Sequence, residues 1–583
     1  MVFLSGERAG TRPLARFLRA GVAPSWADLA AFLLLAATAV LIVRGAGEMS
    51  EPLSQLRVTP VTLDPARLPE YALLTTLRMF AALAASLLFT FTVATLAAKS
   101  RKAELLIVPA LDILQSVPVL GFLTFTVTFF MGLFPGRELG VECAAIFAIF
   151  TSQAWNMAFS FYQSLRTIPN DLDEVSRQFG FSPWRRFVRL ELPFATPSLV
   201  WNVMMSMSGG WFFVVASEAI TVGKTTIALP GIGSWLSLAI ERQDMKAVAV
   251  GVGAMAVVIL LYDQLVFRPV VAWADKFRFE QTASQDRPGS WVYDMVRRTR
   301  WLRMAIAPLS WPAQALAAID WPAVKLEPVR VGPKAARAFD AVWMGLVAIA
   351  VAVAVWFLWN FLSRALAWGD ALTAFGLGLA TLARVVVLIA IASLIWVPIG
   401  VWIGLRPAWA QRLQPIAQFL AAFPANVLFP FVVVAIVAFH ADPNIWLSPL
   451  MVLGTQWYIL FNVIAGASAI PSDMKEAAGI FGIRGWQWWR QIGLPGIFPY
   501  YVTGALTASG GSWNASIVAE AVTWGHTHLE AAGLGSFIAK ATAEGDYAHV
   551  ALGVAVMSIF VIAFNRMLWR PMYRFAERRL RLD

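Results

Sequence analysis

The tract DEVSRQFG at residues 173–180 returns as KEAAGIFG at residues 475–482, which is 302 residues later. Both copies are polar, both carry a glutamate near the start and a glycine at the end, and both lie between long apolar runs. Each copy is followed at the same distance by a leucine–proline pair, Leu192-Pro193 in the first and Leu494-Pro495 in the second. The repeat predicts two equivalent loops, one in each half of the chain.

The composition is that of an integral membrane protein. Of the 583 residues, 59% are hydrophobic and only 14% are charged, which is less charge than a soluble domain of this size carries. The apolar runs reach about 20 residues, as spanning helices require, and do not alternate as membrane β-strands do. The net charge of +11 comes from Lys and Arg in the loops, so it indicates orientation in the membrane and no nucleic-acid partner. The single cysteine, Cys143, excludes an intrachain disulfide.

Run lengths predict an all-α polytopic fold with about twelve spanning helices. The first six are expected near 26–44, 72–98, 104–134, 140–165, 196–222 and 247–268, and the second six near 341–361, 373–404, 413–440, 445–468, 498–523 and 548–568. Basic residues cluster before the first run, after the second, in the first repeated tract and at the chain end. By the positive-inside rule these segments and both termini face the cytoplasm.

The repeat extends far beyond the two tracts. Matching residues at the same spacing are Trp211 with Trp513, Glu218 with Glu520, Asp244 with Asp546, and Arg268 with Arg570, and further upstream Arg78 matches Arg384 at a spacing of 306. Two homologous six-helix domains follow, and an even number of spans gives them a parallel orientation. We expect a first domain at 1–270 with its core at 72–270, a linker at 271–340, and a second domain at 341–583 with its core at 373–571. The basic and aromatic residues at 291–303 predict either a helix on the anionic inner leaflet or a simple tether.

Local signals predict a short helix in each repeated tract. An acidic pair with capping-box spacing opens each helix, namely Asp171 with Glu174 and Asp473 with Glu476. Gly180 and Gly482 stand where a helix ends in the left-handed conformation. A second short helix follows each glycine, and the leucine–proline pair is expected to break it and return the chain to the membrane.

The spacing from glutamate to glycine to leucine–proline resembles the EAA loop of ATP-binding-cassette importer permeases. The second copy is closer to it, with Glu476-Ala477-Ala478, whereas the first has Val175-Ser176 after its glutamate. Gene duplication alone would make two re-entry loops alike, but it would not explain this pattern. The resemblance implies a type I importer permease in a fused double form, whose loops each dock with a cytoplasmic ATPase subunit. The docking residues would be Glu174, Gly180, Leu192, Pro193, Glu476, Ala477, Ala478, Gly482, Leu494 and Pro495.

The stretches around Glu218 and Glu520, with the Gly-x-Gly motifs that follow them, resemble the nitrate, sulfonate, taurine and bicarbonate importer permeases. This resemblance implies a small anion as the solute, although fused permeases for ferric iron share the architecture. It also implies partners: a homodimer of ATP-binding subunits that bind ATP and Mg, a periplasmic or lipid-anchored solute-binding protein, and membrane lipids.

Polar side chains at membrane depth are candidates for the translocation pathway, because their burial is costly. The candidates are Arg78, Arg384, Gln153, Gln456, Glu218 and Glu520. The arginines would attract an anion, extend to the lipid headgroups or pair with a backbone carbonyl. The glutamates would gate the pathway, carry a proton or hydrogen-bond the glycine-rich loop that follows them. The glutamines would line the pathway or pack between helices. The pairs Gly209-Gly210 and Gly510-Gly511 permit either close helix approach or an unwound segment.

The sequence shows no nucleotide-binding loop and no metal-ligand constellation. The chain is therefore expected to be a non-catalytic subunit with no cofactor of its own. An ion-coupled secondary transporter is the competing class, since twelve spans in two halves also suit it and Glu218 and Glu520 could carry its protons. The two EAA-like loops argue against that class, and a membrane enzyme is a more distant alternative.

Overall fold

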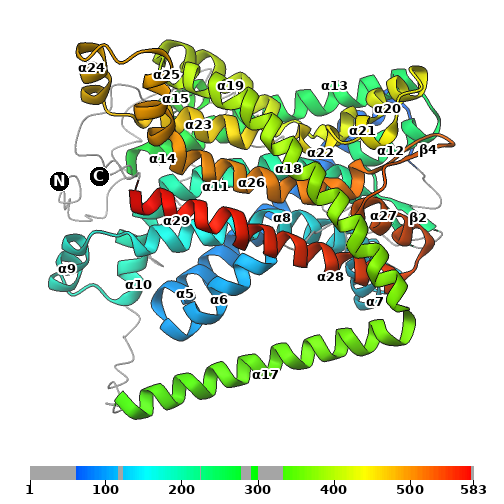
Figure 1. The fold of residues 1–583 in the computed structure, drawn as a ribbon, viewed down its shortest axis with the longest axis horizontal. Coiled ribbons are helices and arrows are strands. Elements are labelled where there is room, and N and C mark those ends of the chain that lie inside the picture. The colour runs from blue at the N-terminus through cyan, green and yellow to red at the C-terminus, as the bar shows by residue number, and fades with distance from the viewer. Residues whose placement is uncertain (1–60, 116–122, 223–224, 278–289, 300–332, 580–583) are drawn as a thin grey trace, which may run out of the picture.

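The computed structural model describes residues 61–115, 123–222, 225–277, 290–299 and 333–579. The spanning helix expected near 26–44 and most of the linker at 271–340 lie outside these residues. We call 61–277 the first half and 333–579 the second half. The described residues form a bundle of helices with two short β-hairpins (Figure 1), which confirms the mostly helical membrane fold.

The elements of the first half, in chain order, are η1 (Pro65–Arg67), α4 (Leu68–Phe89), η2 (Thr90–Ala94), α5 (Thr95–Lys99), α6 (Arg101–Leu114), α7 (Leu123–Leu133), α8 (Leu139–Arg166), α9 (Asn170–Gln178), α10 (Pro183–Arg186), η4 (Phe187–Glu191), α11 (Leu192–Glu218), β1 (Ala219–Val222), β2 (Thr225–Ala228), α12 (Ile232–Glu241), α13 (Met245–Tyr262), η5 (Asp263–Phe267), α14 (Arg268–Ala274) and η6 (Asp275–Phe277). Helix α15 (Trp291–Arg298) lies between the halves in sequence and packs on α14.

The elements of the second half are α17 (Pro333–Ala365), α18 (Trp368–Gly404), α19 (Pro407–Ala422), η7 (Ala425–Leu428), α20 (Phe429–Ala438), α21 (Pro443–Trp446), α22 (Leu450–Leu453), α23 (Trp457–Ala469), α24 (Ser472–Ile480), α25 (Gly485–Trp488), η8 (Trp489–Gly493), α26 (Leu494–Ala519), β3 (Ala521–Trp524), β4 (Thr527–Glu530), α27 (Leu534–Glu544), α28 (Tyr547–Phe564), η9 (Asn565–Trp569) and α29 (Arg570–Arg579). Each hairpin is antiparallel, with Ala219 paired to Ala228 and Ala521 to Glu530.

Six helical runs among the described residues are long and apolar enough to cross a membrane, and a bent pair makes a seventh. The runs are Pro65–Lys99, Pro183–Glu218, Met245–Phe277, Ala341–Ala365, Trp368–Gly404 and Tyr547–Ala576, and the pair is Pro443–Leu453 with Trp457–Ala469. Helices α8 and α26 have 28 and 26 residues, so at 1.5 Å per residue each spans roughly 40 Å, longer than a hydrocarbon core of about 30 Å. The multi-pass fold is confirmed, and the number twelve stays a prediction.

Two spans that we expected as single helices are broken. The span expected at 413–440 is α19 and α20, and the span at 445–468 is the pair bent by 45°. The span expected at 104–134 contains α6 and α7, and residues 116–122 between them lie outside the described residues. Pro424 explains the break after α19, because it donates no hydrogen bond and holds Phe423 in an extended conformation, with ψ of 124°. The spans expected at 196–222 and 498–523 are also too long, since their last residues belong to β1 and β3.

The two halves share even the irregular turns of their helices. The π-helical turns η4 and η8 are 302 residues apart, as are η5 and η9. Helices α10, η4 and α11 form one continuous run, so the expectation that Leu192-Pro193 breaks the helix is wrong, and the same holds for Leu494-Pro495. Each proline is the second residue of the α-helix that follows a π turn, where a missing N–H is tolerated.

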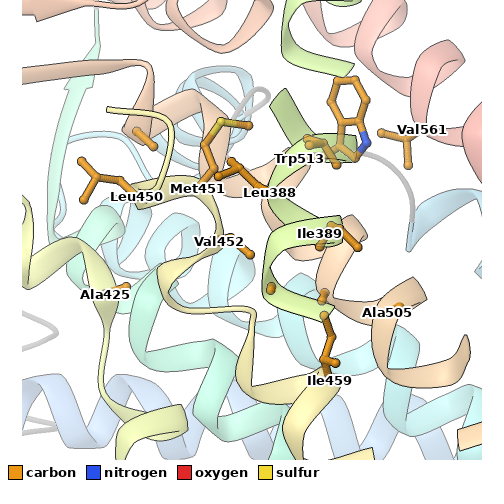
Figure 2. Close-up of a cluster of buried hydrophobic side chains, with 14 of the residues drawn as sticks. Leu388, Ile389, Ala425, Leu450, Met451, Val452, Ile459, Ala505, Trp513 and Val561 are labelled. Carbon is orange, nitrogen blue, oxygen red and sulfur yellow. The ribbon is translucent and has the colours of Figure 1, made fainter. Parts of the chain in front are cut away.

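The core of each half forms where its long helices cross. In the first half α8 packs on α4 and α11, and in the second half α23 packs on α18 and α26. Figure 2 shows Leu388, Met451 and Trp513, from α18, α22 and α26, converging in the second core. Gly210 and Gly511 lie inside continuous helices and face Gln153 and Thr455 closely. Close helix approach is therefore confirmed, and an unwound segment is not observed at these glycines.

Helix α28 begins with a side-chain cap that titrates. Asp546 Oδ1 accepts hydrogen bonds from the backbone amides of Ala548 and His549, both at 3.1 Å. The bond from the His549 amide is the main reason that the pKa of Asp546 lies below its usual range, and the His549 ring adds to it. A carboxylate with a lowered pKa stabilises the fold fully at neutral pH, and this contribution is lost as the pH falls through the lowered value.

We therefore expect Asp546→Ala to lower the free energy of unfolding by about 1 kcal/mol at neutral pH, and by less as the pH falls through the lowered pKa. Thermal unfolding of the purified chain in detergent at a series of pH values measures this difference. Glu544→Ala, at an exposed position at the end of α27, is the control and should change stability little. A deficit for Asp546→Ala that is equal at all pH values would contradict the assignment.

The repeated tracts and the hairpins occupy opposite ends of the bundle. In Figure 1 α24 lies at the upper left and α9 at the lower left, both at the left end of the bundle, while β2, β4 and α27 lie at the right end. The described end of α29 is also at the left (Figure 1). We call the end with α9 and α24 the loop end and the other the hairpin end.

Candidate functional site

At the loop end each repeated tract folds as a helix, a left-handed glycine and a second short helix. We call residues 170–191 loop one and residues 472–493 loop two. Gly180 and Gly482 both have φ of +64°, a conformation that glycine adopts at little cost. The amide of the residue after each glycine bonds back to the helix, Phe181 N to Ser176 O at 3.1 Å and Ile483 N to Ala478 O at 2.9 Å. This is the Schellman motif, and it confirms the expected helix ends.

The expected capping boxes are absent from these two helices. Helices α9 and α24 begin after Pro169 and Pro471, and no side-chain hydrogen bond caps either start. Glu174 and Glu476 are instead exposed to solvent. Their carboxylates are therefore available to a partner, while Ala478 on the opposite face of α24 is buried against the bundle.

Large apolar side chains project from both loops into solvent. In loop one Phe179 is 70% exposed, and in loop two Ile480, Phe481 and Trp486 are 82%, 79% and 74% exposed. All four side chains belong to the loops at the left end of the bundle in Figure 1. A cluster of exposed apolar side chains is typical of a protein interaction site.

Loop one is held to the bundle by a chain of ion pairs. Glu191, only 4% exposed, contacts Lys99 of α5 at 2.9 Å and Arg186 at 3.1 Å. Arg186 also contacts Asp173 of α9 at 2.6 Å, and Asp173 contacts Arg177 at 2.9 Å. The chain of ion pairs thus links α5, η4, α10 and α9, and we call it the charged brace.

Loop two has no counterpart of the charged brace, because its residues have changed together. Lys475 replaces Asp173, Trp488 replaces Arg186, and Gly493 replaces Glu191. The Trp488 ring packs directly against the Cα of Gly493, where any side chain would overlap it, and it contacts Trp489 at 5.6 Å between ring centroids. In loop two, apolar packing around Trp488 therefore occupies the positions that charged residues hold in loop one.

At the hairpin end, the predicted pathway residues Arg78 and Glu218 meet in a buried ion cluster. Arg78 Nη1 donates to Glu218 Oε1 at 2.8 Å and to the carbonyl of Pro230 at 2.9 Å. A third charged residue, Glu142 of α8, accepts from Arg78 Nε and Nη2, both at 2.6 Å. All three side chains are at most 1% exposed.

The second half repeats this arrangement with one change. Arg384 Nη1 donates to Glu520 Oε1 at 3.0 Å and to the carbonyl of Ala532 at 2.9 Å. In the place of Glu142 stands Asn444, whose Oδ1 accepts from Arg384 Nη2 at 3.4 Å. Both arginines therefore pair with a backbone carbonyl, as one of our alternatives expected, and each also pairs with the glutamate of its own half.

The two glutamates fix the chain segment that follows each hairpin. Glu218 Oε2 accepts from the Gly233 amide at 2.6 Å, and Glu520 Oε2 accepts from the Gly535 amide at 2.7 Å. A threonine on the facing helix completes each site, since Thr75 donates to Glu218 and Thr381 donates to Glu520. The hydrogen bond to the glycine-rich loop is confirmed. A role of these glutamates in gating or proton transfer stays a prediction.

Gly535 is needed at this contact, because a Cβ there would overlap the Ser516 carbonyl. The backbone of α26 cannot move aside cheaply, so Gly535→Ala should displace α27 and lower the free energy of unfolding by roughly 1–3 kcal/mol. Thermal unfolding in detergent measures the loss. Gly510→Ala is the control, since nothing lies within 4 Å of its Cβ position, and equal stability of the two variants would contradict the contact.

The two predicted glutamines pack between helices in this conformation. Gln153 is fully buried, and its Nε2 approaches Met207 Sδ at 3.1 Å. Gln456 accepts from Trp396 Nε1 at 2.8 Å and donates to the Leu453 carbonyl at 3.1 Å. The packing alternative describes both residues, and the pathway alternative stays untested.

The halves meet along the middle of the bundle and again at the hairpin end. Asn426 Nδ2 donates to the Phe212 carbonyl at 3.2 Å, and the Gly525 amide donates to the Ile240 carbonyl at 3.1 Å. Each hairpin also reaches across, because β1 contacts α27 and β3 contacts α12.

A cavity of about 30 Å³ between the halves is lined by residues that include Ser208, Trp211, Tyr262, Asp263 and Phe461. This volume suits a water molecule, and none of the six predicted pathway residues lines it. The Tyr262 hydroxyl is buried without a hydrogen-bond partner.

Sequence reasoning missed Glu142, Asn444 and the charged brace. Glu142 and Asn444 are 302 residues apart, but one is charged and the other is not, so the pair gave no matching signal. The members of the charged brace also differ between the copies. Only a search for positions where the repeat fails, next to positions where it holds, would have found them.

The comparison with known proteins matches one segment in each half of the chain. The sequence model of the family described as "Binding-protein-dependent transport system inner membrane component" matches residues 70–268 and 396–581. The nitrate import permease protein of Leptolyngbya laminosa is 27% identical over 188 residues, which are 32% of this chain and 64% of that protein. The bicarbonate transport system permease protein of Synechococcus elongatus is 28% identical over the same shares of both chains.

A glycine betaine/proline betaine transport system permease protein of Escherichia coli is 29% identical over 168 residues, which are 29% of this chain and 43% of that protein. The chain thus spans less than two thirds of the length of each of these relatives.

Proposed function

Because the chain belongs to the family of binding-protein-dependent transport system inner membrane components, we propose that it is the complete transmembrane part of an ATP-binding-cassette importer. Its two halves would form the solute pathway, and loops one and two would couple that pathway to ATPase subunits. The chain itself would hydrolyse no ATP.

The observation that carries this proposal is the pair of loops at one end of the bundle. Both have the same helix–glycine–helix backbone, with φ of +64° at Gly180 and at Gly482, and both expose a glutamate and large apolar side chains. Two matching surfaces on one face suit two copies of one partner, so we propose a homodimer of ATP-binding subunits that bind ATP and Mg.

The loop end would face the cytoplasm of a bacterial cell, with the protein in the inner membrane and both termini on the cytoplasmic side. We propose 1–270 and 341–583 as two permease domains in parallel orientation, with cores at 72–270 and 373–571 and a linker at 271–340. The shared end of α9 and α24 in Figure 1 supports the parallel arrangement. The hairpin end would then receive a periplasmic or lipid-anchored solute-binding protein.

For the solute we propose a small anion of the nitrate, bicarbonate, sulfonate or taurine kind. The support is the similarity to permeases named for nitrate and bicarbonate. The arginines give no support, because carboxylates already balance the charges of Arg78 and Arg384. Glycine betaine is the second candidate, on the similarity to a betaine permease, and ferric iron is a further alternative.

Purification of the tagged chain with its ATPase tests the proposal. We expect two ATPase subunits per chain, and uptake into proteoliposomes that requires ATP and the matching solute-binding protein. Labelled nitrate, bicarbonate, taurine, glycine betaine and ferric iron would be compared as solutes. A complex without ATPase, with uptake driven by an ion gradient, would show a secondary transporter instead.

A further inference from the structure

The hairpin of the second half, β3 with β4, lies against the first half at the hairpin end. We call residues 521–530 hairpin two and residues 219–228 hairpin one. The Trp524 side chain of hairpin two packs against the buried apolar cluster of the first half as well as that of the second. The amide of the next residue, Gly525, donates to the carbonyl of Ile240 near the end of α12 at 3.1 Å. Apolar packing and a backbone hydrogen bond therefore join hairpin two to the other half.

The first half meets hairpin two with Gln243, in the turn between α12 and α13. Gln243 Nε2 donates to the Trp524 carbonyl at 3.2 Å. Gly525 has φ of +58°, and a Cβ at this residue would overlap the Gln243 side chain. The side chain of Gln243 therefore lies directly against the turn of hairpin two, at a place where only glycine leaves room for it.

Gln243 makes this contact from a backbone conformation that is unfavourable for glutamine. Its φ is +56°, in the left-handed region that residues other than glycine, asparagine and aspartate seldom occupy. Strained residues of this kind persist where surrounding contacts hold them, and they are frequent in ligand clamps and switch regions. The Gln243 side chain makes its contacts with Trp524 and Gly525, both in the other half.

The second half builds the same turn with glycine. Gly545 stands 302 residues after Gln243 and has φ of +74°. The amide of the following residue closes both turns at 2.9 Å, from Asp244 to the Ala239 carbonyl and from Asp546 to the Ala541 carbonyl. The turn itself therefore requires no side chain at this position, and Gly545 has none with which to reach hairpin one.

We propose that Gln243 and hairpin two form a one-sided latch between the halves, which is closed in this structure and has to open before solute can pass the hairpin end. The latch is one-sided because the counterparts of Gln243 and Trp524 are Gly545 and the smaller Val222. The strain at Gln243 keeps the latch reversible, because release of hairpin two lets the left-handed residue relax. The opening step rests on the proposed importer function, whereas the latch itself does not.

Hydrogen exchange of the full chain in lipid nanodiscs tests the latch without any assay of transport. Gln243→Gly keeps the left-handed turn and removes the side chain. Gln243→Asn also keeps the turn, but its side chain is one methylene too short to make the same bond to Trp524. We expect the peptide covering 521–530 to exchange about twofold to tenfold faster in both variants, as the loss of one hydrogen bond predicts.

The peptide covering 244–250 is the internal control for the turn. Asp244 Oδ1 accepts from the amides of Lys246 and Ala247, both at 3.0 Å, and thereby caps α13 without Gln243. Exchange of this peptide should stay at the wild-type rate. Unchanged exchange of hairpin two in either variant, or equally faster exchange of both peptides, would overturn the proposal.

A disulfide across the latch tests the opening step. A Cβ at residue 525 would lie 2.5 Å from Gln243 Cγ, so Gln243→Cys with Gly525→Cys brings two thiols within bonding reach. In proteoliposomes with the ATPase, oxidation should stop uptake of the labelled solute that the wild type takes up, and reduction should restore it. Each of the two substitutions alone is the control, because no bond between residues 243 and 525 can then form.

Undiminished uptake after complete cross-linking would overturn the opening step. A wild type that shows no ATP-driven uptake of any labelled solute would contradict the importer function instead, and the exchange of hairpin two would still decide whether the latch exists.

Discussion

A Gly482→Val variant will hydrolyse ATP with its ATPase partner but will move about tenfold less solute for each ATP than the wild type. Residue 482 has φ of +64°, where a β-branched side chain costs of order 1–3 kcal/mol of backbone strain. Nothing lies within 4 Å of its Cβ position, so the whole effect acts through the backbone. A shift of about 1.4 kcal/mol away from the docked loop geometry is a factor of about ten.

Two controls separate backbone strain from the mere presence of a side chain. Gly482→Asn should retain most of the coupling, because asparagine tolerates the left-handed conformation. Gly479→Val adds the same side chain one turn earlier, in open space at a helical position without positive φ. The ratio of solute transported to ATP hydrolysed in proteoliposomes is the measurement. An unchanged ratio of solute transported to ATP hydrolysed in Gly482→Val would contradict a coupling role for this turn.

The exposed carboxylate of Glu476 in loop two allows a second test of the proposed contact with the ATPase. Glu476→Lys reverses the charge of a side chain that is exposed to solvent, so the fold should be unaffected. We expect loss of coupling with normal thermal stability. Unchanged transport in both Glu476→Lys and Gly482→Val would reject the assignment of loop two as a docking element.

Removing both cationic partners of Glu191 will destabilise the first half, and removing Glu191 as well will restore it. The double variant Lys99→Met/Arg186→Met leaves a carboxylate that is 4% exposed without its two ion-pair partners. Lys99 and Arg186 are 41% and 29% exposed while Glu191 is buried, so leaving this carboxylate without a partner should cost about 1–3 kcal/mol. Adding Glu191→Gly removes the stranded charge and recreates the residue found in loop two.

Thermal unfolding in detergent and protease cleavage within loop one measure both effects. Arg177→Met is the control, because its ion pair with Asp173 is on the surface, with the arginine 71% exposed, and such pairs contribute about 0.5 kcal/mol. Equal stability of the double and triple variants would show that Glu191 is not stranded. A double variant as stable as the wild type would show that the charged brace does not hold loop one.

The sequence predicted the parts of the fold that the two halves share. Spacing alone identified the paired loops, the left-handed glycines and the equivalence of Arg78 with Arg384, and the local chemistry of Glu218 and Glu520 pointed to their bonds with the glycine-rich loop. These features depend on residue types that recur at one offset, so a repeat exposes them.

What could not be predicted depends on tertiary contacts or on differences between the copies. The helix continues through Leu192-Pro193 after the π turn η4, and no single residue type predicts such a turn. The partner of Arg78 on α8 comes from a residue 64 positions away, and its counterpart in the second half is uncharged. Pro424 in the sequence indicates the break after α19. We assigned this span from the length of its apolar run alone and therefore did not predict the break.

The crossed hairpins of the two halves have a consequence for how the protein can evolve. In a dimer of separate identical chains each residue appears on both sides of the twofold axis, so a change suited to one side is imposed on the other. Here β1 meets α27 and β3 meets α12 within one polypeptide, and the linker keeps the two surfaces at high effective concentration. Because the two halves are fused in one chain, a residue can change in one half without changing in the other. One molecule can therefore keep Glu142 in the first half and Asn444 in the second, and the charged brace in loop one and a pair of tryptophans in loop two.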